Sequence, residues 1–210
     1  MATGIPRVEG GLEPTWEVAL LFPAQGAWSE EEYFALSDSA NRLIEFDDGK
    51  IGVLEMPIED HQLIVAFLYD AVKAFVNPLQ LGIILFAPLR VRTLTGKFRE
   101  PDIVFMLKEN RLRRGKKYWR GADLVIEVVS DDPKSRDRDL GEKCGEYAEA
   151  GISEYWIADP KNCQIIIHRL HEGKYTDPVT FATGETAASF LLEGFNVNVT
   201  SVFAAAEDQV

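Results

Sequence analysis

The feature that most constrains this chain is an apolar segment near its middle that carries a single charged residue. Residues 123–130 read Asp-Leu-Val-Ile-Glu-Val-Val-Ser, and Glu127 is the only ionisable side chain between Leu124 and Val129. A nearly continuous apolar run, unlike an alternating one, is typical of a central strand that is covered on both faces. We therefore expect a sheet with helices packed against it.

The patterns around this strand alternate between helix and strand. A helix is expected at 29–37 behind Ser29, and another after Asp60, a potential N-cap, with apolar residues at helical spacing from 64 to 75. Hairpins are expected at 43–56 and 82–107. A helix over 137–150 that ends at Gly151, strands at 154–159 and 163–170, and a tail of short strand-like segments complete the prediction. The fold class is a mixed α/β sheet flanked by helices.

The composition indicates one domain. The chain has 210 residues, of which 46% are hydrophobic and 27% charged, as in ordinary globular proteins. We expect an irregular leader over 1–28 and a single domain over 29–210. No apolar run reaches the roughly 18 residues of a membrane span, and the start lacks a signal-peptide pattern. Cys144 and Cys163 lie far apart, which favours free thiols and a cytoplasmic location.

The charge is acidic overall but uneven. The net charge is −12, which argues against a simple nucleic-acid binder, because affinity for nucleic acid depends largely on neutralising phosphates. However, basic residues crowd residues 108–120, where Glu109 is the only acid. This basic segment is compatible with phosphate contact at one face, and equally with a solvated charged loop.

Two carboxylates stand in apolar strand patterns. Asp102 opens the segment Pro-Asp-Ile-Val-Phe, and Glu127 lies within the central strand. A buried carboxylate must be offset by a cation, a metal ion or protonation, because an isolated buried charge is costly. One such acid fits an ion pair with arginine, whereas two on strands adjacent in sequence favour a shared divalent cation. Ligation by oxygen alone suits Mg²⁺ or Mn²⁺ better than zinc.

A lysine on the following helix supplies a third polar group. Lys143 falls at the edge of an apolar stripe formed by Leu140, Cys144, Tyr147 and Ala148, so its stem would pack inward while its ammonium group reaches the rim. The alternative is a surface ion pair with Asp139, four residues earlier, which would contribute only a few tenths of a kcal/mol.

These residues carry a resemblance to a known family. The Asp102 segment, the Glu127 strand and the order Glu-Val-Val-Ser, Arg-Asp-Arg-Asp, Glu-Lys, Tyr-Ala-Glu-Ala-Gly and Glu-Tyr-Trp-Ile-Ala-Asp-Pro resemble the PD-(D/E)XK nuclease superfamily. More narrowly, they resemble the restriction endonucleases of the Uma family. The agreement extends from about Arg42 to Arg169, and the ordered set of motifs is far more specific than Pro-Asp alone.

The resemblance implies site residues. Asp102 and Glu127 would hold the metal ion, with help from the backbone carbonyl of Val128. The superfamily lysine two positions after the glutamate is absent, since Val129 stands there, and Lys143 matches the helix lysine of the narrower family. Glu45 matches an early family glutamate and would be a further metal ligand, or an edge glutamate that faces water. His61 matches a family His-Gln pair, as a helix-capping residue or a neighbour of the site.

The function implied by the resemblance is Mg²⁺- or Mn²⁺-dependent hydrolysis of DNA by an attacking water, which Lys143 would orient or deprotonate. A homodimer is expected, because paired cuts in a duplex often need two copies. The alternatives are a catalytically silent nuclease fold that binds DNA and a homo-oligomeric interaction module. The residues expected to contact DNA are Arg113, Arg114, Lys116 and Lys117 of the basic segment, with Lys134, Arg136 and Arg138.

Overall fold

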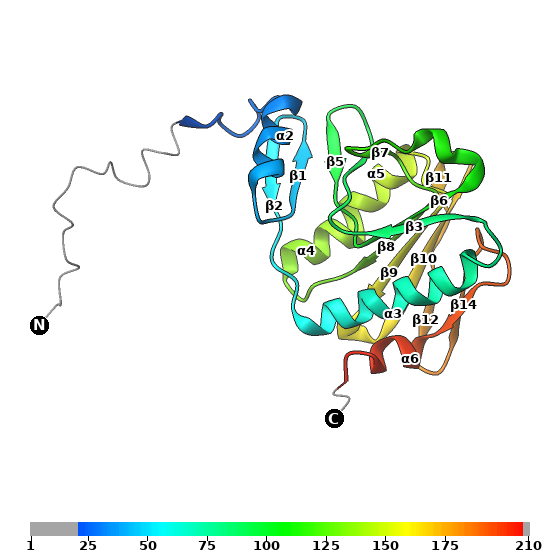
Figure 1. Ribbon diagram of the computed structural model, residues 1–210. Coiled ribbons are helices and arrows are strands. Elements are labelled where there is room, and N and C mark those ends of the chain that lie inside the picture. Colours follow the sequence, from blue (N-terminus) through cyan, green and yellow to red (C-terminus); the bar gives the residue numbers. More distant parts are fainter. Residues whose placement is uncertain (1–20, 208–210) are drawn as a thin grey trace, which may run out of the picture.

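The computed structural model describes residues 21–207 and shows two mixed sheets with helices around them (Figure 1). The larger sheet has seven strands in the order β11-β10-β9-β8-β6-β3, with β12 paired to β10. Strands β8 and β9 are parallel, and the other neighbours are antiparallel. The strands are β3 (Gly82–Phe86), β6 (Ile103–Leu107), β8 (Leu124–Val128), β9 (Glu154–Asp159), β10 (Gln164–His171), β11 (Lys174–Tyr175) and β12 (Val179–Ala182).

The smaller sheet has five short strands in the order β2-β1-β5-β4-β7, in which only the β4–β7 pair is parallel. A separate two-stranded sheet lies near the C-terminus. These strands are β1 (Ile44–Asp47), β2 (Lys50–Val53), β4 (Val91–Arg92), β5 (Lys97–Arg99) and β7 (Trp119–Arg120), and then β13 (Thr186–Ala188) and β14 (Asn196–Asn198).

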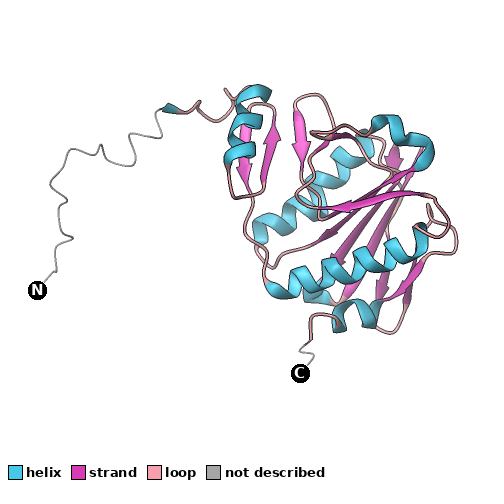
Figure 2. Cartoon of the chain, viewed as in Figure 1, coloured by secondary structure: helices cyan, strands magenta, loops and turns pink. Residues whose placement is uncertain are grey.

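Helices cover both faces of the larger sheet, as the apolar central strand predicts (Figure 2). On one face, α3 (Glu59–Val76) and α6 (Val199–Ala204) pack with Ile126 of β8 into one core cluster. On the other face, Tyr147 of α5 (Lys143–Glu149) packs with Val125 in a second cluster. Every residue of β8 is buried, so the expected central strand is confirmed.

The N-terminal elements follow local sequence signals. Helix α2 (Glu30–Ser39) begins after Ser29, whose side chain and that of Glu32 form a reciprocal capping box. The next hairpin, β1–β2, turns through Asp48 and Gly49, both with positive φ. Such two-residue turns match the twist of the flanking strands. Both the helix and the hairpin are therefore confirmed.

The hairpin expected at 82–107 is divided between the two sheets. Its outer parts, β3 and β6, pair in the larger sheet, while β4 and β5 pair in the smaller one. Pro88 and Pro101 lie between these parts, and proline cannot donate a ladder hydrogen bond. As a result, Asp102 stands where the chain enters the larger sheet.

The helix expected at 137–150 differs in register. It begins earlier, as α4 (Pro133–Asp137), and passes through a π-helical turn, η3 (Arg138–Glu142), before α5. A π turn rotates the residues after it relative to an uninterrupted α-helix. Leu140, within this turn, is 37% exposed, whereas Lys143, directly after it, is 2% exposed. The prediction that the Lys143 ammonium reaches the rim was therefore wrong.

Three smaller differences concern ends and tails. Helix α3 begins after Ile58, so Asp60 lies in its first turn and is not the cap. The tail contains helix α6 in addition to strands, and Asn198 caps it. The remaining short helices are η2 (Lys108–Arg113) and η4 (Pro160–Asn162). The expected leader falls mostly outside the described residues.

Candidate active site

Asp102 and Glu127 meet where β6 begins and β8 ends. The two strands are antiparallel, with Ile103 opposite Ile126. Asp102, which precedes Ile103, therefore lies beside Glu127, which follows Ile126. The Asp102 N–H donates to Glu127 Oε2 over 3.3 Å, and the Val128 N–H donates to Asp102 Oδ2 over 2.8 Å. The structure thus brings together the two carboxylates that the sequence singled out.

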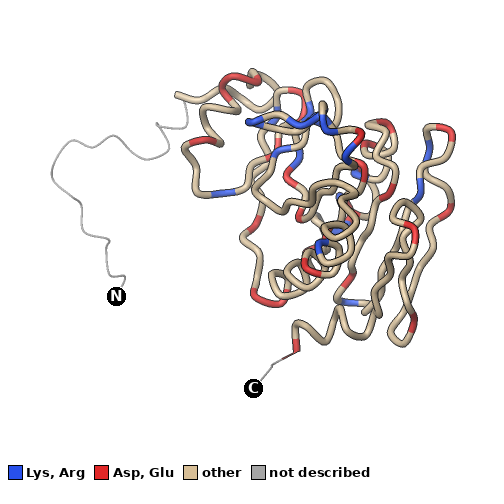
Figure 3. The backbone as a smooth tube through the Cα atoms, turned by 45° about the vertical axis from the view of Figure 1, so that its right-hand side comes forward, with Lys and Arg blue, Asp and Glu red and all other residues tan. Residues whose placement is uncertain are grey.

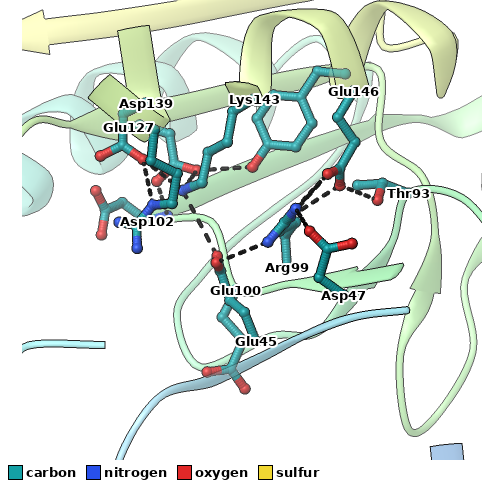
Figure 4. A network of polar contacts seen from close by, with 12 residues as sticks. Glu45, Asp47, Thr93, Arg99, Glu100, Asp102, Glu127, Asp139, Lys143 and Glu146 are labelled. Carbon is teal, nitrogen blue, oxygen red and sulfur yellow. Dashed lines mark hydrogen bonds and ion pairs between the residues drawn. The ribbon is translucent and has the colours of Figure 1, made fainter. Parts of the chain in front are cut away.

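Lys143 lies among three carboxylates (Figure 4). Its Nζ is 2.7 Å from Glu127 Oε1, 3.0 Å from Asp139 Oδ1 and 3.7 Å from Glu45 Oε1. Burial alone would lower the pKa of Lys143, but the negative charges of Glu127, Glu45 and Asp139 outweigh it and raise that pKa. The ammonium group therefore keeps its proton. Asp139 does pair with Lys143, but inside the protein and not at the surface.

Glu127 is the most connected acid of the group. Its Oε1 accepts hydrogen bonds from Lys143 and, over 2.8 Å, from the hydroxyl of Tyr147. Burial raises the pKa of Glu127, and the nearby charges of Asp102 and Asp139 add to this, while Lys143 opposes it. A cation that approached Glu127 would remove this electrostatic cost.

Glu45 points into the protein and is 3% exposed, so the alternative of an edge glutamate facing water was wrong. Its Oε2 lies 3.3 Å from Nη1 of Arg99, and Arg99 also pairs with Glu146 and Asp47. Glu45 therefore contacts two cations, Lys143 and Arg99. It links the smaller sheet, through β1 and β5, to the helix that carries Lys143 (Figure 4).

His61 is a neighbour of the site. Its Nε2 lies 3.2 Å from Asp102 Oδ2. Burial lowers the pKa of His61, but the hydrogen bond to Asp102, the charges of Asp102 and Glu127, and the Val128 backbone together raise it. His61 thus fixes the orientation of the Asp102 carboxylate from helix α3.

A small polar pocket of about 50 Å³ opens at these residues. Burial raises the pKa of one of its acids, Glu100, to about 7. Its acids outnumber its basic groups, which are Lys143, Arg138 and His61. The acids in the lining are Glu55, Glu100, Asp102, Glu127 and Asp139.

This pocket suits a hard cation. The excess of negative charge attracts one, and the volume has room for an ion with a few waters. Among residues 21–207, no three His, Cys, Asp or Glu side chains are preassembled around one metal position. Mg²⁺, however, usually binds through one or two carboxylates and keeps several waters. The pair Asp102 and Glu127 therefore fits such an ion.

The basic segment lies away from this pocket. Helix η2 follows β6, so it stands at the opposite end of that strand from Asp102, and Figure 3 shows a long run of Lys and Arg in the upper part of the molecule. Arg113 has structural contacts: it pairs with Asp123 over 3.1 Å and donates to the Arg120 carbonyl over 2.9 Å. Lys117 lies over the ring of Phe34.

The other basic residues differ in their surroundings. Arg114 and Lys116 are exposed. Arg136 forms a bidentate ion pair with Asp159, with hydrogen bonds of 2.9 and 2.8 Å. This pair holds helix α4 against the end of β9. Arg138 binds Asp139 over 3.1 Å and lines the pocket. The Lys134 side chain lies outside the described residues.

The sequence interpretation missed several members of this network. Asp139 was noted only as a surface partner, although its place four residues before Lys143 is the signal for the buried pair. Glu100 was not considered, although it precedes Pro101 and Asp102. Tyr147 belongs to the predicted apolar stripe and is buried, but its hydroxyl also donates to Glu127.

None of the helices described between residues 21 and 207 has the length and apolar character needed to cross a membrane. No curated protein matches the chain. A solved structure of similar fold is a "putative nuclease belonging to DUF820" from Anabaena variabilis ATCC 29413, with a TM-score of 0.70 and 17% sequence identity. The match covers 88% of this chain and 99% of that one.

A family model agrees with this likeness of fold and extends it to the sequence. The model is that of Uma2, described as "Putative restriction endonuclease", and it matches residues 30–200. This range contains every residue that lines the pocket and all the strands of the described sheets. The chain therefore belongs to the Uma2 family of restriction endonuclease-like proteins.

Proposed function

We propose that this protein is an Mg²⁺- or Mn²⁺-dependent endonuclease that hydrolyses phosphodiester bonds in DNA. The observation that carries the proposal is the pairing of Asp102 and Glu127 on adjacent strands, in an acidic pocket that also contains Lys143. Membership of the Uma2 family supports a nuclease activity for this fold. The choice of metal, of DNA as substrate and of these residues is our inference.

Asp102 and Glu127 would hold the metal ion, and the Val128 carbonyl would contribute a third oxygen. When bound, such an ion polarises a phosphoryl oxygen and makes a bound water more acidic. His61 would keep the Asp102 carboxylate in the orientation seen here, since its Nε2 binds Asp102 Oδ2. Glu45 pairs with two cationic side chains, Arg99 and Lys143. We therefore assign it the role of positioning Lys143 and not that of a ligand to the metal ion.

Lys143 would act as a positive charge at the reacting phosphate. Because the surrounding carboxylates raise its pKa, it is a poor proton acceptor, so we favour orientation of the water and stabilisation of developing negative charge over deprotonation. Its charge is held within hydrogen-bond distance of Glu127 and Asp139 before any substrate arrives. A preorganised charge of this kind does not have to reorient during the reaction.

DNA would contact the exposed basic residues at a distance from the pocket. Arg114 and Lys116 are the best placed of the predicted set, whereas Arg113 and Arg136 have structural ion pairs. Acidic surroundings predict weak, strongly salt-dependent binding. A homodimer would place two pockets on one duplex, and edge strand β3, with Ile83, Leu85 and Phe86 exposed, offers a surface for pairing.

The test is Mn²⁺ binding by calorimetry on the wild type and on Asp102→Ala, followed by plasmid cleavage in the same samples. Asp70→Ala, on the exposed side of α3, is the matched control. We expect the wild type and the control to bind and cleave, and Asp102→Ala to do neither. Binding without cleavage would favour the catalytically silent nuclease fold. Absence of Mn²⁺ binding and of cleavage, together with no DNA affinity in a separate binding assay at low salt, would favour an interaction module.

A further inference from the structure

A second pocket adjoins the candidate active site. Its volume is about 290 Å³, at the lower end of the range for small-ligand sites. It shares Glu55, Pro57, His61 and Ser130 with the lining of the smaller acidic pocket. The two pockets are therefore adjacent, and we call this second one the side pocket.

The walls of the side pocket are largely apolar and lie at the surface. Met56 is 63% exposed and Ile58 is 68% exposed. Pro57, Val129 and Pro160 complete the apolar lining. Ile58 stands at the N-cap of α3 without making a capping hydrogen bond, although Ser, Thr, Asp and Asn are the preferred residues there. Its side chain therefore does not cap the helix and is free to contact a ligand.

The polar groups of the side pocket are mainly hydrogen-bond acceptors. Its acids are Glu55, Asp60, Asp131 and Asp132, of which Asp132 already accepts from the Ser135 N–H. The described residues that line it include no Lys or Arg, and its basic group, His61, pairs with Asp102. Ionised carboxylates accept hydrogen bonds but do not donate them. Such a rim repels phosphate groups and favours a ligand that presents N–H donors beside a flat apolar surface.

Resting on the proposed nuclease function, we infer that the side pocket binds an unpaired nucleobase next to the scissile phosphate. The faces of a base would pack against Met56 and Ile58, and its amino group would donate to the carboxylates, as cytosine N4 does to Asp or Glu. A base inside a duplex is stacked and cannot enter a pocket unless it is turned out. The substrate class is therefore DNA in which one nucleotide at the cut is unpaired, either in a single strand or turned out of a duplex.

The inference is tested by binding of fluorescein-labelled eight-nucleotide strands, one of cytosine and one of thymine, measured by anisotropy with Ca²⁺ present. Thymine has no amino group, so the wild type should bind the cytosine strand more tightly. The double variant Met56→Ser and Ile58→Ser should lose about fivefold in affinity for that strand, because the apolar contact with one face of the base is removed. Serine is a favoured N-cap, so the helix should persist. Leu79→Ser, at a comparably exposed residue outside both pockets, should leave the affinity for both strands unchanged.

A second variant tests the acidic rim. The combined Glu55→Gln, Asp60→Asn and Asp131→Asn variant should bind both strands more tightly, because repulsion falls. It should distinguish cytosine from thymine less than the wild type does, because an amide accepts from cytosine N4 as a carboxylate does but also donates to thymine O4. Equal affinities of the wild type for the two strands, or an unchanged affinity in the Met56 and Ile58 variant, would overturn the inference. Plasmid cleavage is measured separately, so loss of the nuclease proposal would be recognised independently of strand binding.

Discussion

Lys143 Nζ and Glu127 Oε1 lie 2.7 Å apart inside the protein, although the two residues come from a helix and a strand. The ammonium group also pairs with two further acids, Asp139 and Glu45. An ion pair of this kind is costly to desolvate, so its stability depends on every partner being present. The three carboxylates around this one ammonium group therefore leave an excess of negative charge in the site.

Removal of the lysine charge should destabilise the fold. Lys143→Met would leave Glu127, Asp139 and Glu45 buried without their shared cation, and breaking such a pair typically costs about 3–5 kcal/mol in free energy of unfolding. Urea denaturation measures this change. We also expect Mn²⁺ to restore part of the lost stability, because a bound cation offsets the same carboxylates.

The control for this prediction is Lys161→Met, which removes an exposed lysine and should leave the free energy of unfolding nearly unchanged. If Lys143→Met unfolds at the same urea concentration as the wild type, the buried ion-pair cluster does not exist in solution.

Glu127→Gln should separate metal binding from folding. The amide keeps an oxygen that can accept from the Tyr147 hydroxyl and from Lys143, so the hydrogen-bond geometry survives. It lacks the charge that a hard cation needs. We expect an unchanged far-ultraviolet circular dichroism spectrum and a loss of Mn²⁺ binding in calorimetry. Glu149→Gln, at an exposed position on α5, is the control. Unchanged Mn²⁺ affinity in Glu127→Gln would rule out the proposed metal site.

The sequence predicted the centre of this site better than its surroundings. Glu127 is recognisable because a charge inside an apolar strand demands a partner, and Asp102 because it opens the neighbouring apolar segment. The family resemblance then selected Lys143. The burial of Lys143 was missed because the π turn at η3 has no simple hydrophobic period, so an ordinary helix placed this residue at the rim.

The division of one hairpin into two sheets was also beyond the sequence patterns. Residues 82–93 and 98–107 alternate as a single hairpin would, and only packing decides that β4 and β5 leave the larger sheet. The same division places Arg99 against Glu45, and Glu45 in turn contacts Lys143, so both contacts join distant segments. Local patterns identify elements, whereas such long-range contacts depend on how the elements are assembled.

The two neighbouring arginines of the basic segment should behave differently. Arg113→Gln removes the ion pair with buried Asp123 and should lower the free energy of unfolding by about 1–2 kcal/mol. Arg114→Gln removes an exposed charge and should leave stability unchanged. If Arg114 contacts a phosphate, this variant should bind DNA more weakly and reduce the slope of log affinity against log salt by about 1. Equal effects of both variants on stability would contradict this assignment.

Stability should fall in mild acid because of His168. Its ring stacks on Tyr155, with 5.9 Å between centroids, and its Nε2 lies 3.5 Å from Cys144 Sγ. Burial lowers the pKa of His168 in the folded protein, whereas a histidine in the unfolded chain has a pKa of about 6.5. The contribution of neutral His168 is thus complete above that pH and is lost as the pH falls below it, because the unfolded state then binds the extra proton.

The measurement is urea denaturation of the wild type and His168→Phe between pH 7.5 and 5.5. Phenylalanine keeps a ring to stack on Tyr155 but cannot be protonated. We expect the free energy of unfolding of the wild type to decrease more steeply toward pH 5.5 than that of the variant. Because both proteins retain His61, whose raised pKa acts in the opposite direction, the difference between the two curves isolates His168. Parallel curves would mean that the folded protein protonates His168 as readily as the unfolded chain does.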